Sequence, residues 1–302
     1  MTIQSYRGDA LIRPQDLNAI DQRVYEPHAS ELKARSIFAL KTDIPAGAKT
    51  YSYDVLTRSG AAKILAPGAT DVPLVDADLT EETVKIYSIA AAFNISVQEV
   101  REAQMANRQI EVTKADTVRK AIAEKENQIA FSGDKTHGIK GLTDSVGIQV
   151  YATPQNEGGT STKWADKTGE EIVDDIIEAK SKVDMLNGHE ADTLLLTPDA
   201  KKQLQKKVFN EFTKQTALQY IQSESFFKRI ETINDLKGKG LAGTDCFVVL
   251  DSSPDVVELG IPLDIMRHPQ EYAFPNTKVP FEERTTGLII RYPMAICRAD
   301  GI

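Results

Sequence analysis

The sequence predicts a mixed α+β fold in which one long helix is flanked by β strands and followed by a compact α/β lobe. Three observations lead to this prediction. Apolar residues recur at helical spacing over residues 94–131, residues 165–265 alternate between helix and strand patterns, and the segments on both sides of the long helix alternate as strands do. A chain of 302 residues can bury a substantial core and ordinarily divides into two lobes.

Composition indicates a globular protein. Hydrophobic residues make up 41% of the chain and charged residues 26%, which are values typical of folded domains. The net charge of −8 argues against a protein that grips nucleic acid through a broad basic face, but not against one that encloses nucleic acid without binding it tightly. Cys246 and Cys297 each lie in an apolar run, so we expect buried thiols rather than a disulfide.

The sequence carries no membrane signal. The first fifteen residues are polar throughout and do not form a charged and then apolar leader. No apolar run approaches the roughly 20 residues that span a bilayer. We therefore expect a soluble protein that is made and used in a reducing cytoplasm.

Residues 1–44 predict an arm. Leu17, Ile20 and Val24 have the spacing of a short helix that ends before Pro27. A second short helix is expected over residues 29–34. The segment has too few apolar residues to close a core of its own, so we expect it to lie on the rest of the protein or on a neighbouring copy.

Two strands with a long connection between them follow the arm. Residues 49–58 and 82–94 alternate in polarity and are rich in β-forming residues. The connection, residues 59–81, is punctuated by glycine and proline, and a connection this long is commonly functional or an interaction element. Together these segments predict a protruding hairpin over residues 45–92. Because such a hairpin cannot stabilise itself, we expect it to rest on another subunit.

The long helix is predicted over residues 94–131. Ser96 and Glu99 have the spacing of a capping box at its start. Apolar residues then recur on one face: Ala115, Val118, Ile122 and Ile129. A helix of this length would reach roughly 50 Å and would serve as a scaffold element. The period is poor over residues 105–110, which leaves a break near Asn107 open.

Residues 165–265 predict the α/β lobe. Residues 168–186 have one apolar face and an acidic first turn, as an amphipathic helix does. Short buried strands are expected at residues 193–197 and 246–250. By pattern, residues 256–259 form a strand beside the second of these.

The tail of the chain, residues 279–302, alternates in polarity as one or two long strands. It is too short to fold alone. We therefore expect it to return and pack on the long helix.

The segment from Gly133 to Gly141 resembles a phosphate-binding loop at first sight. That loop needs lysine directly after its second glycine and then serine or threonine for the metal. Here Ile139 follows Gly138, and Gly141 takes the hydroxyl position. The segment also follows a helix rather than a strand, so a turn-rich connector is favoured over a nucleotide site.

Other candidate chemistry is also outweighed by simpler interpretations. Alternating oxygen ligands suggest a calcium loop that lacks its glycine and final glutamate, so an acidic solvated loop is favoured for Asp76, Asp78, Thr80 and Glu82. The histidines have no partner at metal-ligand spacing: His28, His137, His189 and His268. Adjacent Asp174 and Asp175 point to different helix faces, and no nucleophile-elbow pattern occurs. We expect no catalytic, cofactor or metal site.

The order of arm, hairpin, long helix, glycine turn, α/β lobe and returning strand resembles that of a known family. It is similar to the major capsid proteins of tailed bacteriophages, which have the Hong Kong 97 fold, and to the related encapsulin shell proteins. The most specific segment is AEKENQIAFSGDKTHGIKGL, residues 123–142, where a helix ends in a glycine-rich GI-x-GL connector. The late segment TTGLIIRYPMAI, residues 285–296, is also similar to such proteins.

The resemblance covers essentially the whole chain and implies a division into five regions. These are an N-terminal arm (1–44), an extended loop (45–92), a peripheral domain built on the long spine helix (93–164), an α/β axial domain (165–265) and return strands that complete the peripheral domain (266–302). It also implies self-assembly through hexamers and pentamers into an icosahedral head that encloses double-stranded DNA without sequence-specific binding. Such a protein is assembled in the bacterial host cytoplasm and resides in the virion. Scaffolding, portal and decoration proteins are candidate partners.

Contacts between subunits of such a shell are expected on charged residues of the arm, loop and helix. The candidate set is Arg13, Arg23, Arg58, Lys63, Asp76, Asp78, Arg101, Arg119 and Glu126. Two alternatives stay open at this point. One is an encapsulin-type nanocompartment of the same architecture with an enzyme as cargo. The other is a two-lobed soluble enzyme or ligand-binding protein, for which the arm and long loop would have no purpose.

Overall fold

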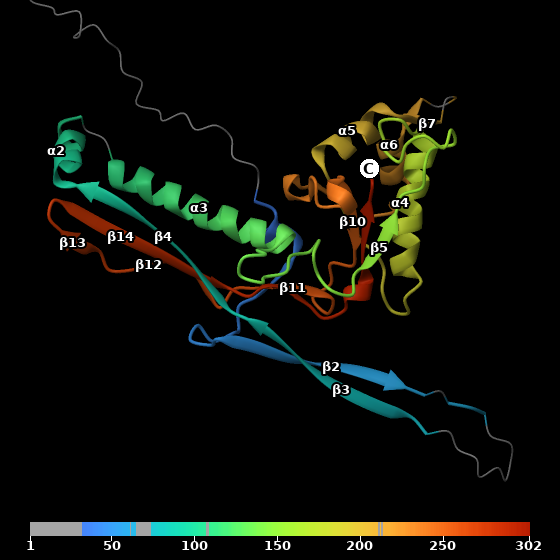
Figure 1. Cartoon of the computed structure of the whole chain (residues 1–302), viewed down its shortest axis with the longest axis horizontal. Helices are drawn as coiled ribbons and strands as arrows, with labels where there is room; N and C mark the ends of the chain where they lie inside the picture. Colours follow the sequence, from blue (N-terminus) through green and yellow to red (C-terminus); the bar gives the residue numbers. More distant parts are fainter. Residues whose placement is uncertain (1–31, 61, 65–73, 107–108, 211, 213) are drawn as a thin grey trace, which may run out of the picture. The chain divides into compact units, whose positions relative to one another are not determined.

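The computed structural model describes residues 32–60, 62–64, 74–106, 109–210, 212 and 214–302 (Figure 1). They form the mixed helix and strand fold that the sequence predicts. The helix predicted around residues 17–24 lies outside the described residues. Of the helix predicted over 29–34, residues 29–31 also lie outside them, and the helix observed there, α1 (Ala34–Ile37), begins at Ala34.

The predicted hairpin is present, but its second strand differs from the prediction. Strand β2 (Thr50–Ser59) pairs antiparallel with β3 (Asp76–Lys85) along the full length of both strands. The predicted strand 82–94 is wrong in its extent. Strand β3 ends before Ile86, and the chain continues as β4 (Tyr87–Ser96), which pairs in a different sheet. Periodicity alone does not reveal the break, since both strands alternate in polarity.

The interpretation of residues 76–82 as an acidic loop is wrong. Asp76, Asp78 and Glu82 lie on β3, where alternate residues share one face of the strand. The loop predicted over residues 59–81 is correspondingly shorter. In the β2–β3 register, Asp76 pairs with Ser59, Asp78 with Thr57 and Glu82 with Tyr53, and this pairing cannot be read from the sequence of β3 alone.

The predicted long helix is divided into α2 (Val97–Met105) and α3 (Ile110–Ser132). The capping box is confirmed: the Ser96 hydroxyl accepts from the Glu99 backbone N–H, and the Glu99 carboxylate accepts from the Ser96 N–H. With 23 residues, α3 is about 35 Å long rather than roughly 50 Å. The two helices end and begin on either side of Asn107, near which the sequence leaves a break open, but Asn107 itself lies outside the described residues.

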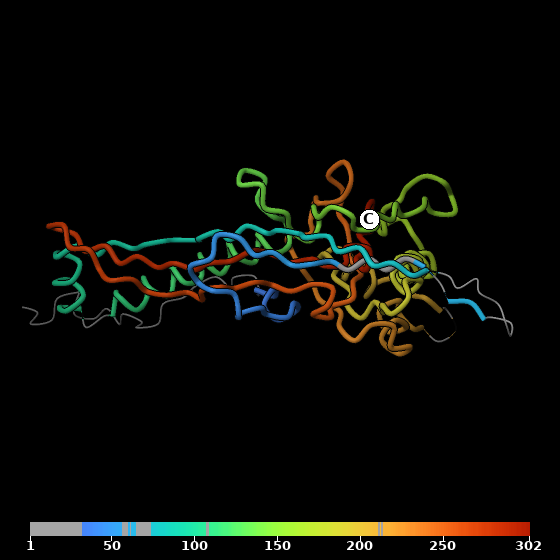
Figure 2. The backbone as a smooth tube through the Cα atoms, turned by 90° about the horizontal axis from the view of Figure 1, so that it is seen from below, coloured from blue at the N-terminus to red at the C-terminus, as the bar shows by residue number. Residues whose placement is uncertain are grey.

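A sheet covers the apolar side of α3. Strand β4 pairs with β14 (Asn276–Thr285) from Ser96 and Asn276 to Tyr87 and Thr285, and the two strands run along α3 (Figure 1 and Figure 2). Strands β12 (Leu263–Arg267) and β13 (Glu271–Ala273) pair with the other edge of β14. Between sheet and helix lies a small apolar core of Phe93, Val118, Ile122, Val279 and Phe281.

The α/β lobe is built on a sheet with the strand order β5-β16-β10-β6-β9. The strands are β5 (Gln149–Ala152), β16 (Ile296–Asp300), β10 (Cys246–Leu250), β6 (Thr193–Leu196) and β9 (Arg229–Thr232). Helices on the lobe are α4 (Gly169–Asp184), α5 (Pro198–Lys206) and α6 (Ala217–Ser223). The helix predicted at 168–186 and the strands at 193–197 and 246–250 are therefore confirmed. Both cysteine thiols are free and buried, as expected.

Two strands lie in sheets that the sequence did not indicate. Strand β11 (Val257–Gly260) pairs with β15 (Gly287–Ile290) and β1 (Ala39–Lys41), so the prediction that it lies beside β10 is wrong. The tail is divided as well: β14 lies against α3, as expected, whereas β16 pairs with β10 and β5 in the lobe. Both assignments depend on long-range pairing, which local alternation does not specify.

Shorter elements complete the described chain. They are β7 (Val208–Asn210), β8 (Gln215–Thr216), η2 (Asn234–Leu236), η3 (Leu241–Gly243) and η4 (Pro293–Ala295). Residues 133–148 contain turns and a single bridge between Asp134 and Ile139, in keeping with the predicted turn-rich connector.

A buried ion pair ties the loop before α4 to that helix, and it generates the first prediction. Lys167 Nζ lies 2.6 Å from Asp175 Oδ2, which also accepts from the Trp164 indole at 2.9 Å, and both charged side chains are buried. Lys167→Met leaves a buried carboxylate without its cation, so we expect a loss of about 3–5 kcal/mol in unfolding free energy. Denaturant unfolding measures it. The exposed Lys163→Met should stay within about 0.5 kcal/mol, and equal effects would contradict the assignment.

The glycine connector generates a second prediction. A Cβ on Gly141 would lie 2.3 Å from the Gly133 backbone N and 2.7 Å from the Ser132 carbonyl carbon, and neither backbone atom can yield without moving the end of α3. Gly141→Ala should therefore lower the unfolding free energy by at least about 2 kcal/mol. Gly47→Ala is the control, because nothing lies within 4 Å of its Cβ position. Thermal unfolding of both variants measures the two changes in stability. A Gly141→Ala variant as stable as the wild type would be inconsistent with this packing.

Candidate assembly surfaces

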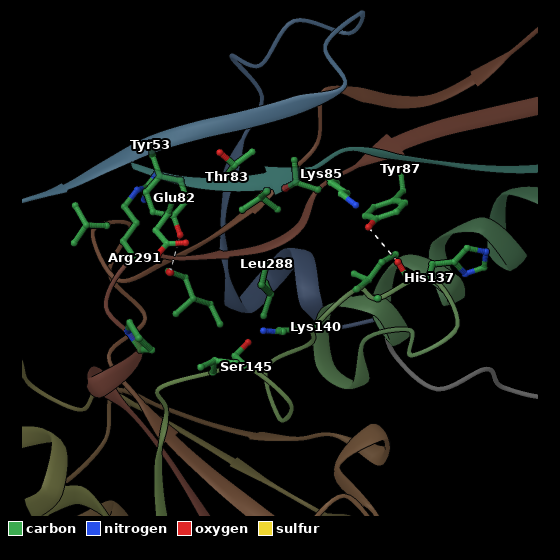
Figure 3. A pocket seen from close by; sticks show the side chains of 18 of the residues that line it. Tyr53, Glu82, Thr83, Lys85, Tyr87, His137, Lys140, Ser145, Leu288 and Arg291 are labelled. Atoms are coloured by element: carbon green, nitrogen blue, oxygen red, sulfur yellow. Dashed lines mark hydrogen bonds between the residues drawn. The ribbon is translucent and has the colours of Figure 1, made fainter. Parts of the chain in front are cut away.

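The base of the hairpin is fixed to the body of the protein. The Tyr53 hydroxyl donates to the Ile290 carbonyl at 3.0 Å, and the Arg291 guanidinium lies 5.7 Å from the centre of the Tyr53 ring (Figure 3). Arg291 also pairs with Glu258. A small apolar cluster of Ile44, Ile86 and Ile289 lies under the same region. The hairpin therefore leaves the body from a rigid base.

A groove of about 800 Å³ lies between the hairpin base, the glycine connector and β15 (Figure 3). Its polar lining includes Glu82, Lys85, His137 and Lys140. The Tyr87 hydroxyl donates to the His137 carbonyl at 3.3 Å and so joins the two walls. These groups do not form a nucleophile and base pair, and the described residues contain no cluster of three or more metal-ligating side chains. The groove lies where the hairpin base meets the glycine connector and β15.

Beyond its base, the hairpin exposes apolar surface. Among the described residues, β2 and β3 pair with each other and with no further strand. Large apolar side chains toward the tip are exposed: Ile64, Leu74, Val75 and Leu79. An isolated two-stranded ribbon is marginally stable in water, and exposed apolar surface of this kind usually marks a protein contact.

The structure brings few of the predicted contact residues together. Asp76 and Asp78 are exposed on β3, and Arg101 is exposed on α2; none of them forms an ion pair with the described residues. Arg119 is exposed on α3, 3.6 Å from Asp116. Lys63 is exposed beyond the end of β2.

The remaining members of that set fall outside what the structure describes or lie inside the chain. Arg13 and Arg23 lie outside the described residues, and Arg58 is described only by its place in β2. Glu126 is buried in its own chain, where the Arg35 guanidinium donates to both of its carboxylate oxygens. Its place on α3 gave a signal, because Glu126 lies four residues after Ile122 and so falls on the buried stripe.

Arg35 connects three elements through carboxylates that sequence reasoning missed. Besides Glu126 on α3, it donates to Glu283 on β14 at 2.6 Å and to Asp264 on β12 at 3.0 Å. Glu283 is 0% exposed. Arg35 and Glu283 are separated by 248 residues, so no local pattern could have indicated the pair. The Asn127 side chain adds to this joint by accepting the backbone N–H groups of Lys33 and Ala34.

The buried charges around Arg35 do not balance unless one carboxyl group is protonated. Burial and the neighbouring Glu126 carboxylate together outweigh the lowering effect of Arg35 and raise the pKa of Glu283 to about 9. The hydrogen bonds that the Arg35 guanidinium donates to Glu126 in turn raise the pKa of Arg35. At neutral pH, Glu283 is therefore protonated beside an ionised Arg35, and the cluster holds α1 against α3 and β14.

Comparison with known proteins identifies the family. The sequence profile of the family described as major capsid protein matches residues 60–302. The chain belongs to the major capsid protein family. A search of curated proteins finds no match. The capsid protein is a structural shell protein and a component of the phage capsid, as its resemblance to the family predicts.

Solved structures give the same fold at low sequence identity. The capsid of Myoviridae phage XM1 superposes with a TM-score of 0.80 at 12% identity, covering 97% of this chain and 100% of that one. The corresponding values for Mycobacterium phage Bobi are 0.66, 17%, 94% and 94%. For a virus-like particle from Pyrococcus furiosus they are 0.60, 13%, 88% and 91%. The Hong Kong 97-like fold is thus confirmed, and the nanocompartment and two-lobed enzyme alternatives are not favoured.

The described part of the capsid protein contains no helix with the length and apolar character needed to cross a bilayer.

The protonated Glu283 of the capsid protein generates a prediction about pH. Its folded pKa of about 9 lies above its ordinary value of 4.5, so its stabilising contribution is full below about pH 4.5 and is lost as the pH rises toward 9. Glu283→Gln keeps the shape of the side chain and removes this titration. We expect the variant's melting temperature to fall less steeply than the wild type's between about pH 5 and about pH 9.

The neighbouring Glu282 provides the control. The hydrogen bond from Ser88 is the largest cause that lowers the pKa of Glu282, so its contribution is lost as the pH falls and not as it rises. Glu282→Gln should therefore leave the alkaline slope unchanged. Identical alkaline slopes for wild type and Glu283→Gln would show that Glu283 is not protonated in the folded protein.

Proposed function

We propose that the capsid protein assembles through hexamers and pentamers into a closed icosahedral head that encloses double-stranded DNA without reading its sequence. The observation that carries the proposal is the β2–β3 hairpin, whose base is anchored while its strand edges and apolar tip are left uncovered by the described chain. A neighbouring copy would cover that surface. Many weak contacts of this kind, summed over a shell, give a stable assembly.

The charge distribution supports contacts between the hairpin and the spine of another copy. Asp76 and Asp78 present carboxylates on one face of β3, whereas Arg101 and Arg119 present cations on the exposed sides of α2 and α3. Complementary charges of this kind set register and orientation at an interface. Lys63 stays in the proposed contact set, and so do the residues whose side chains are not described, Arg13, Arg23 and Arg58. Glu126 is left out because Arg35 binds it within one chain.

The five predicted regions remain our proposal for the division of labour. The extended loop corresponds to the hairpin, the peripheral domain to α3 with the β4–β14 sheet, and the axial domain to the α/β lobe. Because β16 pairs with β10, the proposed axial domain also includes this last strand, whereas β14 stays in the proposed peripheral domain. Scaffolding, portal and decoration proteins are proposed partners on the strength of the family alone.

The overall charge suits a container for DNA. With a net charge of −8, the chain as a whole repels a polyanion, and strong non-specific binding would need many cationic contacts to phosphate. We propose that the protein acts through its surfaces, as a non-enzymatic shell protein that needs no cofactor or metal.

Particle formation by the full chain tests the proposal. Negative-stain microscopy and light scattering of the purified protein should show closed shells or capsomer-sized rings. A monodisperse monomer at all protein and salt concentrations would overturn it.

A shortened hairpin gives the sharpest variant. Asp54 pairs with Glu81 across the ribbon, so residues 54–81 can be replaced by a two-residue Asn-Gly turn that leaves Tyr53 and Glu82 as cross-strand neighbours. The anchored base and the large core stay intact, so the variant should fold with an unchanged melting temperature. We expect the assembled fraction to fall at least about tenfold. Undiminished shell formation would show that the hairpin does not make the subunit contacts.

A further inference from the structure

One face of α4 carries a row of like charges. Glu170, Asp174 and Glu178 are exposed and spaced four residues apart, opposite the buried side of the helix that faces the core of the lobe. None of the three forms an ion pair within the described part of the chain. The next residue in the row is a cation, Lys182, but its ammonium lies 5.7 Å from the centre of the Tyr151 ring. Glu170 suits the first turn of the helix, but like charges four residues apart repel one another, so the row as a whole leaves repulsion in the monomer.

A row of opposite sign lies on α5. Lys202 and Lys206 are exposed four residues apart, and the half-buried Lys201 lies beside them. No ion pair within the described residues involves these three lysines. The carboxylate in the first turn of α5, Asp199, is taken by Lys237 at 3.0 Å. This face, like that of α4, carries repulsion that a partner of opposite charge would relieve.

The two faces do not meet within one chain. Helix α6 contacts both α4 and α5 and lies between them, with α4 at the outer edge of the lobe (Figure 1). The capsid protein therefore presents an acidic helix face and a basic helix face at separate places on the same lobe.

We propose that the acidic face of α4 on one copy docks on the basic face of α5 on the next copy. The proposal rests on the proposed function, because it names the partner surface used by lobes that assemble side by side. A contact between two different faces of identical subunits is heterologous, and it forms a ring when the rotation between neighbouring copies closes, as in a hexamer or pentamer. Complementary charge at that contact steers association and fixes the register of neighbouring lobes.

A second copy is the one partner that accounts for both faces. Nucleic acid would be attracted by the lysines of α5 and repelled by the carboxylates of α4. A bound cation would suit α4 and leave α5 unexplained. A neighbouring lobe matches both faces with the same contact, repeated at every position in a ring.

Charge reversal tests the pairing. The acid-to-base variant carries E170K, D174K and E178K, and the base-to-acid variant carries K201E, K202E and K206E. Each should fold, because the substituted positions lie on the outer sides of the helices, and each alone should lose at least about tenfold of its assembled fraction. The chain that carries all six changes should recover shells, since the two faces are complementary again. Light scattering and microscopy measure assembly, and circular dichroism and melting temperature check folding.

A matched control makes the same change in net charge as the acid-to-base variant, but at other exposed positions. Glu190, Glu224 and Asp255 are exposed and form no ion pair with the described residues, so E190K, E224K and D255K together should leave assembly unchanged. The pairing would be overturned if either reversed variant alone formed shells, or if the chain with all six substitutions formed none. Shells formed by the wild type would still support the proposed function in that case. A base-to-acid variant that assembles normally but loses associated nucleic acid would assign α5 to nucleic acid instead. Absence of wild-type particles would overturn the proposed function itself.

Discussion

The guanidinium of Arg35 holds α1, the helix before the hairpin, against the long helix α3. Arg35 binds carboxylates on α3, β12 and β14, elements drawn from widely separated parts of the chain. Glu126 and Glu283 are buried beside this cation, whereas Asp264 is exposed, and the two buried carboxylates would repel each other if both were ionised. The raised pKa of Glu283 relieves that repulsion, while Arg35 donates to both side chains. The start of the described chain, the spine helix and the long sheet are thus interdependent.

The same arrangement explains why the hairpin can project without loosening the fold. Strands β4 and β14 form one continuous pairing under α3, and the break at Ile86 redirects the chain from that sheet into the hairpin. Tyr53, Arg291 and the isoleucine cluster then fix the base of the hairpin. Beyond Val55, the described strands β2 and β3 pair only with each other, which is why the proposed function assigns this surface to a neighbouring copy.

Sequence reasoning succeeded where the controlling interaction is local. The capping box at Ser96 marks the start of α2, the apolar face and acidic first turn of residues 168–186 mark α4, and the alternation of residues 49–58 marks β2. It failed where the partner is distant. Residues 256–259 and 296–300 have strand character, but their sheets are chosen by β1, β15 and β10. For the assembly surfaces, Asp76 and Asp78 are exposed as expected but on a strand, and Glu126 is bound by an arginine 91 residues away.

The chain contains one tryptophan, Trp164, and the fold gives it an unusual use. Its indole is buried in the lobe, 5.1 Å from the Phe247 ring, and is hydrogen-bonded to the carboxylate that also binds Lys167. The hairpin, α2 and α3 contain none. The tryptophan emission of the protein, excited at wavelengths where tyrosine does not absorb, therefore reports on the interior of the lobe alone. Subunits that join through the hairpin will leave the emission spectrum unchanged, whereas any rearrangement inside the lobe during shell formation will alter it, so that the two events are separable in unlabelled particles.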